Sequence, residues 1–581
     1  MAWMELSARN KTLLALALTC KSFTEPALDL LWQYLRGLAP LIRCLPQSLW
    51  KMNAQKLEFQ RTMTLDDWSI FCKYNHRVRS LNRAVHEVGT ETWRTLSCPP
   101  FSPPLLPNLT SLDWYETTSE TFPYVWLFVT PKLTKLNIFP GNLTFGLSEQ
   151  SILSSISMLC PSVSHFSFHS FGSLELEDTS TALQCWSHLH SVTTGRLSEA
   201  AILHLSNLPS LRVLKFTLPS TPISPNTQRL LQHHGFCAIQ ELEITCEGDL
   251  ALLYTFLEKL SIAPKVLSYV ITIHDVDFTL VPPAFISRLS DPCAHSSLEE
   301  VWLYITDWST DHHASIGAAT FQPLFAFRNL RKLSFQAYCG VRLDDAVLLQ
   351  MAKAWPLLED LSFDAYHNLS HDVTPHAFVS LLQHCSRLVS VAVFINWSTI
   401  DGRDIPPTVP YQGFSHNALS EAYFGCPIIR HPTRIAAFIS AIAPKMKSIE
   451  AWDHCYYDDH PDFKKYSTRW KVVQRLVRSF SMVREQEKGM KMTAGAGVDE
   501  EFREPSVEVG GDVDGGGEGE EEDSGSEGEY TPHSDELDSS DSGGRMIQNA
   551  DNTTPDSLCF APVHLIQVVS QSSHSSPSQV A

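Results

Sequence analysis

The sequence lacks the cysteine and hydrophobic patterns that define several common protein classes. Its 14 cysteines are spread over 581 residues, no two are closer than Cys237 and Cys246, and no Cys-x-x-Cys pair occurs. This spacing excludes the usual zinc fingers and a dense disulfide scaffold. No run approaches the 18 apolar residues of a membrane-spanning helix. We therefore expect free thiols, a location in the cytoplasm and/or nucleus, and no membrane partner.

Basic charge is scarce, and acidic charge is concentrated at one end of the chain. Lys and Arg total 44 against 64 Asp and Glu, which gives a net charge of −20. Residues 499–544 hold 18 of the acidic residues and a single basic one, Arg503, so residues 1–498 are nearly neutral. Because nucleic-acid binding needs a basic face, we expect no nucleic-acid partner. The Gly- and Glu-rich stretch cannot bury enough apolar surface to fold, which predicts a disordered acidic tail over 486–581.

The motifs of the common catalytic and cofactor sites are also missing. The sequence contains no G-x-x-x-x-G-K-[ST], no G-x-G-x-x-G after a predicted strand, no H-E-x-x-H and no G-x-S-x-G. Residues 453–462 concentrate His, Cys and carboxylate side chains that could hold a metal, but a polar loop closing the fold explains them as well. We expect a protein that is not an enzyme and has no cofactor and no metal. Catalysis by scattered residues is the alternative.

One pattern, often preceded by Pro, recurs through the middle of the chain: L-x-x-L-x-hydrophobic. Its first clear copy reads Leu109-Thr-Ser-Leu112-Asp-Trp114. Further copies begin at Leu133, Val163, Leu189, Leu211, Ile239, Val266, Leu298, Leu330, Leu358, Leu388, Leu419 and Met446, with weaker ones at Ala54 and Val78. From Leu109 onward the spacing averages about 28 residues. Such a period is typical of a repeat array, in which no unit can bury its own apolar face.

Each repeat has the pattern of a strand followed by a helix. The alternating L-x-L turns every second side chain toward a core, whereas the period between copies changes to 3.6. Residues 345–355 form one such helix, and Thr374 and Pro375 are suited to open another. This arrangement resembles the leucine-rich repeat, in its ribonuclease-inhibitor-type branch. The expected fold class is therefore α/β, a leucine-rich-repeat solenoid with a terminal cap over 46–485.

Residues 1–45 contain two short helical patterns. We predict a helix over 11–20 that buries Leu14, Ala17 and Leu18, followed by a second helix that Thr24 caps. These helices could simply close the first repeat, because the end of a repeat array needs a cap.

The same residues also carry a family resemblance. The segment L-x-L-x-C-K-x-F, followed by A-L-D-x-L-W-x-x-L, resembles the second half of an F-box as found in fungal F-box/leucine-rich-repeat proteins. The matching residues are Leu16, Leu18, Cys20, Phe23, Leu31 and Trp32. The resemblance implies a partial F-box over 1–45 that docks on a Skp-type adaptor through these residues. It further implies a substrate-recognition subunit of a Skp/cullin/F-box-type ubiquitin ligase, whose repeats bind a target protein.

The match departs from the F-box pattern in one respect. The Leu-Pro-x-Glu helix that opens an F-box is missing before Leu13. We therefore expect the chain as given to bind a Skp adaptor weakly or not at all, and a version with that helix restored to bind well. A leucine-rich-repeat interaction scaffold with no ubiquitin-ligase link, intracellular or secreted, is the alternative function.

The outward positions of the strands predict where a target protein binds. The third, fifth and seventh positions of each copy point away from the core, and in a solenoid they line the concave face. Exposed aromatic residues there are unfavourable unless a partner covers them. We hypothesise that Trp302 and Tyr304 anchor the target and that Asp360 and Asp364 select basic residues in it. The same face is expected to include Phe394, Tyr423 and Trp452; packing of these aromatics on one another is the alternative.

Overall fold

The computed structural model describes residues 2–495, apart from 55, 83–87, 116–119, 142–145, 171–177, 259, 274–280, 290–294, 308–314, 338–339, 366–371, 405–409 and 453–460. The chain divides into two units, Met1–Glu500 and Glu501–Ala581, and every described residue lies in the first. The expectations for the acidic tail from 496 onward, and for most of 453–462, therefore lie outside the described residues.

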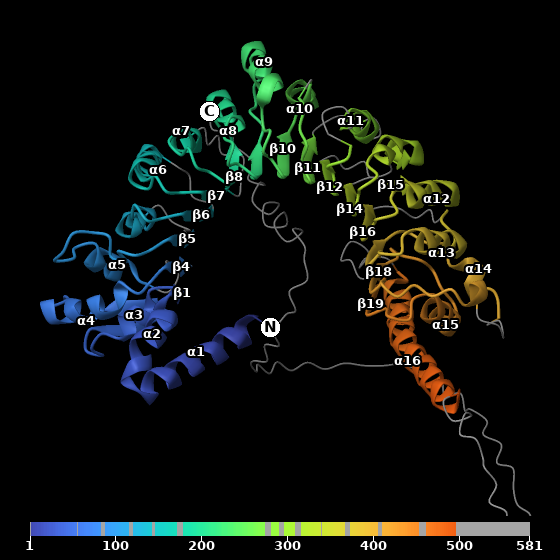
Figure 1. Cartoon of the computed structure of the whole chain (residues 1–581), viewed down its shortest axis with the longest axis horizontal. Helices are drawn as coiled ribbons and strands as arrows, with labels where there is room; N and C mark the ends of the chain where they lie inside the picture. The colour runs from blue at the N-terminus through green and yellow to red at the C-terminus, as the bar shows by residue number, and fades with distance from the viewer. Residues whose placement is uncertain are drawn as a thin grey trace, which may run out of the picture. The chain divides into compact units, whose positions relative to one another are not determined.

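Within the described residues, fifteen strands form one continuous sheet in which every neighbouring pair is parallel (Figure 1). In order across the sheet they are β1 (Tyr34–Leu35), β4 (Ser80–Asn82), β5 (Ser111–Tyr115), β6 (Lys135–Gly141), β7 (His165–Ser170), β8 (Ser191–Arg196), β9 (Val213–Thr217), β10 (Glu241–Glu247), β11 (Val266–Ile273), β12 (Glu300–Asp307), β14 (Lys332–Ala337), β16 (Asp360–Ala365), β17 (Ser390–Ala392), β18 (Glu421–Tyr423) and β19 (Ser448–Glu450). Two small sheets pair β13 (Ser315–Gly317) with β15 (Gly340–Arg342) and β2 (Trp50–Asn53) with β3 (Lys56–Phe59).

Helices fill most of the connections and lie on the outer side of this sheet, while the strands line its inner, concave side (Figure 1). The helices are α1 (Ala2–Thr19), α2 (Lys21–Trp32), α3 (Ala39–Arg43), α4 (Leu65–Asn75), α5 (Thr90–Leu96), η1 (Phe122–Phe128), α6 (Leu147–Leu159), α7 (Asp178–Gln184), α8 (Glu199–Ser206), α9 (Pro225–His234), α10 (Leu250–Leu257), α11 (Val281–Leu289), η2 (Ala318–Ala326), α12 (Asp345–Ala354), α13 (Pro375–His384), α14 (Ser398–Asp401), η3 (Pro410–Gly413), α15 (Pro432–Ile442) and α16 (Phe463–Gly495). The expected helices at 345–355 and after Thr374 are confirmed as α12 and α13.

The repeat pattern determines how the strands stack. Leu112 of β5 aligns with Leu136 of β6 and with Phe166 of β7, and all three side chains are buried. The residue at the fourth position of each copy thus lies in the same layer of the core as the fourth-position residues of the neighbouring copies. Strand starts are tied in the same way, since the backbone N–H groups of Ser164 and His165 both donate to the Thr134 carbonyl, at 2.9 and 3.0 Å. The expected leucine-rich-repeat solenoid is confirmed.

Two of the predicted repeat starts are wrong. Val266 aligns with Glu241 and Glu300, which occupy third positions, so this copy begins two residues earlier, at position 264. The weak copy at Ala54 does not join the main sheet, because β3 pairs antiparallel with β2. The copy at Val78 is correct, and its strand β4 pairs with β5 on one side and with β1 on the other. Strand β1 lies inside the segment expected to be helical.

Carboxylates tie neighbouring helices together on the outer side. Asp345, in the first turn of α12, accepts hydrogen bonds from the backbone N–H and the hydroxyl of Thr374, the N-cap of α13, both at 2.7 Å. Glu199 of α8 accepts from Ser224, the N-cap of α9, in the same way. Asp401 of α14 accepts hydrogen bonds from the backbone N–H groups of Arg430 and His431, which directly precede α15. Each acid satisfies donors that a helix start leaves unpaired, and so holds adjacent repeats in register.

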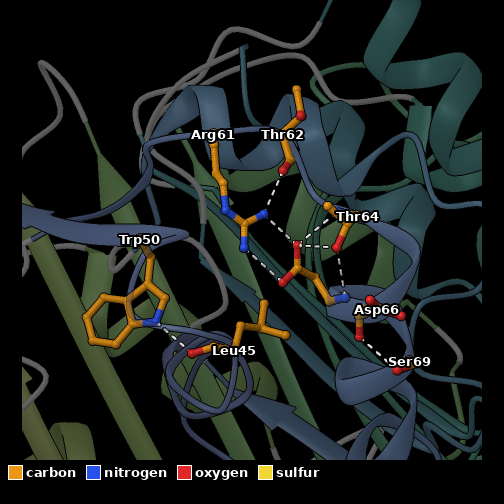
Figure 2. Close-up of polar contacts among 8 residues, drawn as sticks. Leu45, Trp50, Arg61, Thr62, Thr64, Asp66 and Ser69 are labelled. Atoms are coloured by element: carbon orange, nitrogen blue, oxygen red, sulfur yellow. Dashed lines mark hydrogen bonds and ion pairs between the residues drawn. The ribbon is translucent and has the colours of Figure 1, made fainter.

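A similar cap fixes the start of α4 (Figure 2). The hydroxyl of Thr64 accepts from the Asp67 N–H, and the Asp67 carboxylate accepts from the Thr64 N–H. Arg61 donates to both carboxylate oxygens, at 2.6 and 3.0 Å, and Asp67 is only 2% exposed. The Arg61 guanidinium holds the pKa of Asp67 well below the usual carboxyl range. Asp67 therefore stays ionised at neutral pH and couples α4 to the segment before it.

The N-terminal helices differ from the expectation. The first helix, α1, starts at Ala2 rather than near 11, and Leu14 and Leu18 are 50% and 79% exposed rather than buried. Ala17 is buried as expected, and Leu13 is buried with it. Thr24 does not cap α2 but lies within it, and its hydroxyl donates to the Ala17 carbonyl at 2.9 Å. This bond, together with the packing of Leu13 and Ala17, orients α1 so that Leu14 and Leu18 face solvent.

The last helix closes the other end of the sheet. Helix α16 packs on α15 and β19 through buried Tyr466, Trp470, Val473 and Val477. The indole N–H of Trp470 donates to the Pro427 carbonyl at 3.0 Å. A terminal cap was expected, but the boundary proposed at 486 falls inside this helix.

Candidate protein-binding surface

On several strands of the sheet, every second residue faces the concave side and is half-buried. In β5, β9, β10 and β11 buried and half-buried residues alternate strictly. The half-buried ones occupy the third, fifth and seventh positions of the repeat, as predicted. These positions form rows that cross the sheet, because the strands are in register.

Trp302 is a large apolar side chain that this surface exposes. It occupies the fifth position of β12 and is 40% exposed. Its register neighbours are Ser268 of β11 and Ser334 of β14, whose side chains are too small to cover an indole. An aromatic ring flanked by small polar residues is a suitable anchor for a protein partner.

Tyr304 lies two residues further along the same strand. Its register neighbours are Val270 and Gln336, and its side chain is half-buried. The expected proximity of Trp302 and Tyr304 on one face therefore follows from their shared strand. Asp364 of β16 aligns with Gln336 of β14, and for Asp364 the structure describes the backbone only.

Asp360 lies in the row of third positions. It aligns with Lys332 of β14 on one side and with Ser390 of β17 on the other. Burial raises the pKa of Asp360 to about 6; Lys332 opposes this rise, and the acidic side chains of Glu421 and Glu300 add to it. A basic group from a partner would relieve this unfavourable environment of the carboxylate.

The expectation that Phe394 is exposed is wrong. Strand β17 ends at Ala392, and Phe394 is only 7% exposed. Its ring lies against Gly425, where the backbone has a φ of +72° and an added Cβ would come within 2.1 Å of the ring carbons. Tyr423 meets the same ring edge to face, with centroids 6.4 Å apart, and remains half-buried on β18.

The exposure expected for Trp452 is wrong as well. It is 3% exposed, its N–H donates to the Pro427 carbonyl at 3.0 Å, and its ring stacks on Tyr466 of α16. A helix that sequence analysis did not foresee therefore covers the last aromatic of the series.

Aromatics at the other end of the face pack on one another. Tyr115 of β5 and Phe139 of β6 stack with centroids 4.1 Å apart and nearly parallel rings. Next to them, Asn137 donates to Asp113 at 2.5 Å. For this pair the alternative of mutual packing holds, which leaves the region around Trp302 as the better candidate for a binding surface.

Sequence analysis missed a row of charges at the second position of four repeats. Arg331 lies 3.5 Å from Glu299 and 2.8 Å from Glu359, and Lys265 is also 3.5 Å from Glu299. The alternation of sign at positions one repeat apart was the signal that could have revealed it. This row borders the concave face with charges that neutralise one another.

The residues expected to dock an adaptor fall into two groups. Leu16, Leu18 and Phe23 are 41%, 79% and 54% exposed, and Cys20 is exposed too. The hydrogen bond with Ser22 lowers the pKa of the Cys20 thiol. Leu31 and Trp32 are half-buried, and Trp32 stacks on Tyr74 of α4 with centroids 4.8 Å apart. The residues of the first group are exposed on and between α1 and α2, whereas the second group holds α2 against the repeats.

Two features of the described residues bear on ligand classes. In the ranges that the structure describes, no three His, Cys, Asp or Glu side chains are placed to hold a metal ion. Among the same residues, none of the helices combines the length and the apolarity needed to cross a membrane.

Comparison with known proteins yields structural similarity alone. No family model and no curated protein matches this sequence. Among solved structures, the chain is similar to an internalin from Listeria monocytogenes, with 15% identity, 71% of this chain and 92% of that chain covered, and a TM-score of 0.31. It is also similar to a leucine-rich-repeat protein from Leptospira interrogans, with 15% identity, 60% and 79% coverage, and a TM-score of 0.30. Scores this low add nothing to the repeat register described above, on which the assignment as a leucine-rich-repeat solenoid rests.

Proposed function

We propose that this protein is a non-catalytic substrate receptor of a Skp/cullin/F-box-type ubiquitin ligase in the cytoplasm and/or nucleus. In this proposal the concave face around Trp302 binds a target protein, and the helix pair α1 and α2 docks a Skp-type adaptor. A leucine-rich-repeat array suits the first task, because it offers an extended concave surface for a protein partner.

The observation that carries the adaptor proposal is the exposure of several large apolar side chains on the helix pair. Leu14, Leu16, Leu18, Phe23 and Leu30 are each at least 41% exposed within two short helices. Several large apolar side chains on one small element are unfavourable in water unless a partner covers them. Three of them, Leu16, Leu18 and Phe23, are among the residues through which the sequence resembles an F-box.

A direct binding titration with a purified Skp-type adaptor tests this proposal. Leu18→Asp and Phe23→Asp should each abolish binding of the full-length chain, even if the parent affinity is weak. The matched control is Met158→Asp on α6, because Met158 is 77% exposed, close to the 79% of Leu18. The proposal fails if the adaptor binds neither the parent chain nor a version with the Leu-Pro-x-Glu helix restored, or if all three variants bind as the parent does.

One observation favours the alternative of an interaction scaffold without a ligase link. Helix α2 leads directly into β1, the first strand of the sheet, and Arg77 forms ion pairs with Glu25 and Asp29 of α2. The helix is therefore part of the first repeat and does the work of a cap. A scaffold would keep its target after Phe23→Asp and would bring no cullin with it.

A further inference from the structure

Helix α16 carries a row of basic side chains on the face opposite to the one it buries. Lys464, Lys471, Arg475 and Arg478 are all exposed. Their spacing of seven, four and three residues places them along one line of the helix. At 1.5 Å per residue this line is about 21 Å long. We refer to these four residues as the basic row.

Within the described part of the chain, no carboxylate pairs with the basic row. The ion pair that α16 makes there joins Lys465 to Asp462, to one side of the row. No acidic residue occurs between Lys464 and Arg478. Instead, the side chain of Arg478 donates to the backbone carbonyl of Lys447 at 2.5 Å. Lys471, Arg475 and Arg478 follow one another at spacings of four and three residues, at which like charges on a helix repel, and an anionic partner would remove that repulsion.

The basic row ends beside exposed apolar side chains. Met482 follows Arg478 by one helical turn and is 58% exposed, and Val483 is 51% exposed. A phosphate backbone gains nothing from contact with apolar side chains, whereas a protein segment can cover them with an apolar residue of its own. Residues 1–498 are also nearly neutral, so they lack the broad positive field that nucleic-acid binding requires.

We propose that the basic row binds an acidic segment of a partner protein, a stretch of Asp and Glu with an apolar residue at the end that meets Met482 and Val483. Charge complementarity along the row supplies the attraction, and the apolar contact sets the direction of the segment. This surface lies on α16, apart from both sites proposed above, so it does not depend on the proposed function.

The test uses the full-length chain and a labelled synthetic peptide of Glu and Asp that ends in two leucines, titrated by fluorescence anisotropy. Lys471 and Arg475 are the residues to change, because neither side chain makes a hydrogen bond or ion pair in the described part of the chain. Reversing both charges, Lys471→Glu with Arg475→Glu, should weaken binding at least about tenfold. Lys353→Glu, at an exposed position on α12, is the matched control and should leave the affinity unchanged. Higher salt should weaken the parent complex.

Three outcomes would overturn the proposal. One is an unchanged affinity in the charge-reversed protein. Another is a single-stranded oligonucleotide that binds the parent as tightly as the peptide does and no longer binds the charge-reversed protein. That result would make the basic row a nucleic-acid site. The third is a Met482→Ser variant whose affinity falls equally for the leucine-ended peptide and for an all-acidic peptide. If the reversed protein melts well below the parent, the neutral pair Lys471→Gln with Arg475→Gln replaces it, with the same expected direction.

Discussion

Asp360→Asn should make the protein more stable at neutral pH. Burial raises the pKa of this carboxyl from its ordinary value of 3.8 to about 6, against the attraction of Lys332. The folded state therefore binds the proton more tightly than the unfolded state does. The stability that this proton contributes is fully present below pH 4 and is lost as the pH rises to about 6. A rise of roughly two pKa units corresponds to about 3 kcal/mol at most.

Asparagine imitates the protonated carboxyl at every pH, so the difference between variant and parent isolates this one group. Urea unfolding at pH 4 should give nearly equal free energies of unfolding, and at pH 7 the variant should be more stable by up to about 3 kcal/mol. Lys332→Met should have the opposite effect. Because it removes the cation that favours the ionised Asp360, the free energy of unfolding should fall more steeply between pH 4 and 7 than it does in the parent. Parallel curves for Asp360→Asn and the parent over that range would refute the reasoning.

Three further substitutions test the packing that supports the proposed sites. Asp67→Asn should cost about 2–3 kcal/mol at pH 7, because it breaks the buried pairing with Arg61, and the difference should vanish as the pH falls through the depressed pKa of Asp67; equal urea midpoints at pH 7 would contradict this. Gly425→Ala should cost more than about 2 kcal/mol through the clash with Phe394 and the positive φ, whereas Gly195→Ala, with nothing within 4 Å of the added Cβ, should be nearly neutral. Trp470→Ala should cost about 3–5 kcal/mol by opening the cap that α16 forms, and a thermal melt close to that of the parent would show that the last repeat does not need it.

The solenoid could be predicted because its apolar pattern recurs with so little variation. Where a copy departed from the pattern, the register was missed: position 264 is a proline, and Val266 resembles a first position although it occupies a third. The alignment of Trp302 and Tyr304 on one strand followed from period two alone. The burial of Phe394 did not, because it depends on where β17 ends.

The terminal helices show the same limit. Apolar residues surround α1 on several sides, so Leu13 with Ala17 and Leu14 with Leu18 are equally good stripes in the sequence, and only packing decides between them. For α16 a usable signal existed, since its buried residues recur at helical spacing from Tyr466 to Val477. What could not be read was that this helix covers Trp452.

The measurement that tests the account most directly is quantitative mass spectrometry of the proteins that co-purify with the tagged full-length chain and with two variants. Phe23→Asp should lose the Skp-type adaptor and its cullin while keeping a target protein. Trp302→Ala should keep the adaptor and weaken the target by about 2 kcal/mol, roughly thirtyfold. If both variants retain the same proteins as the parent, or lose the same ones together, the division of adaptor and target between the N-terminal helices and the concave face is wrong.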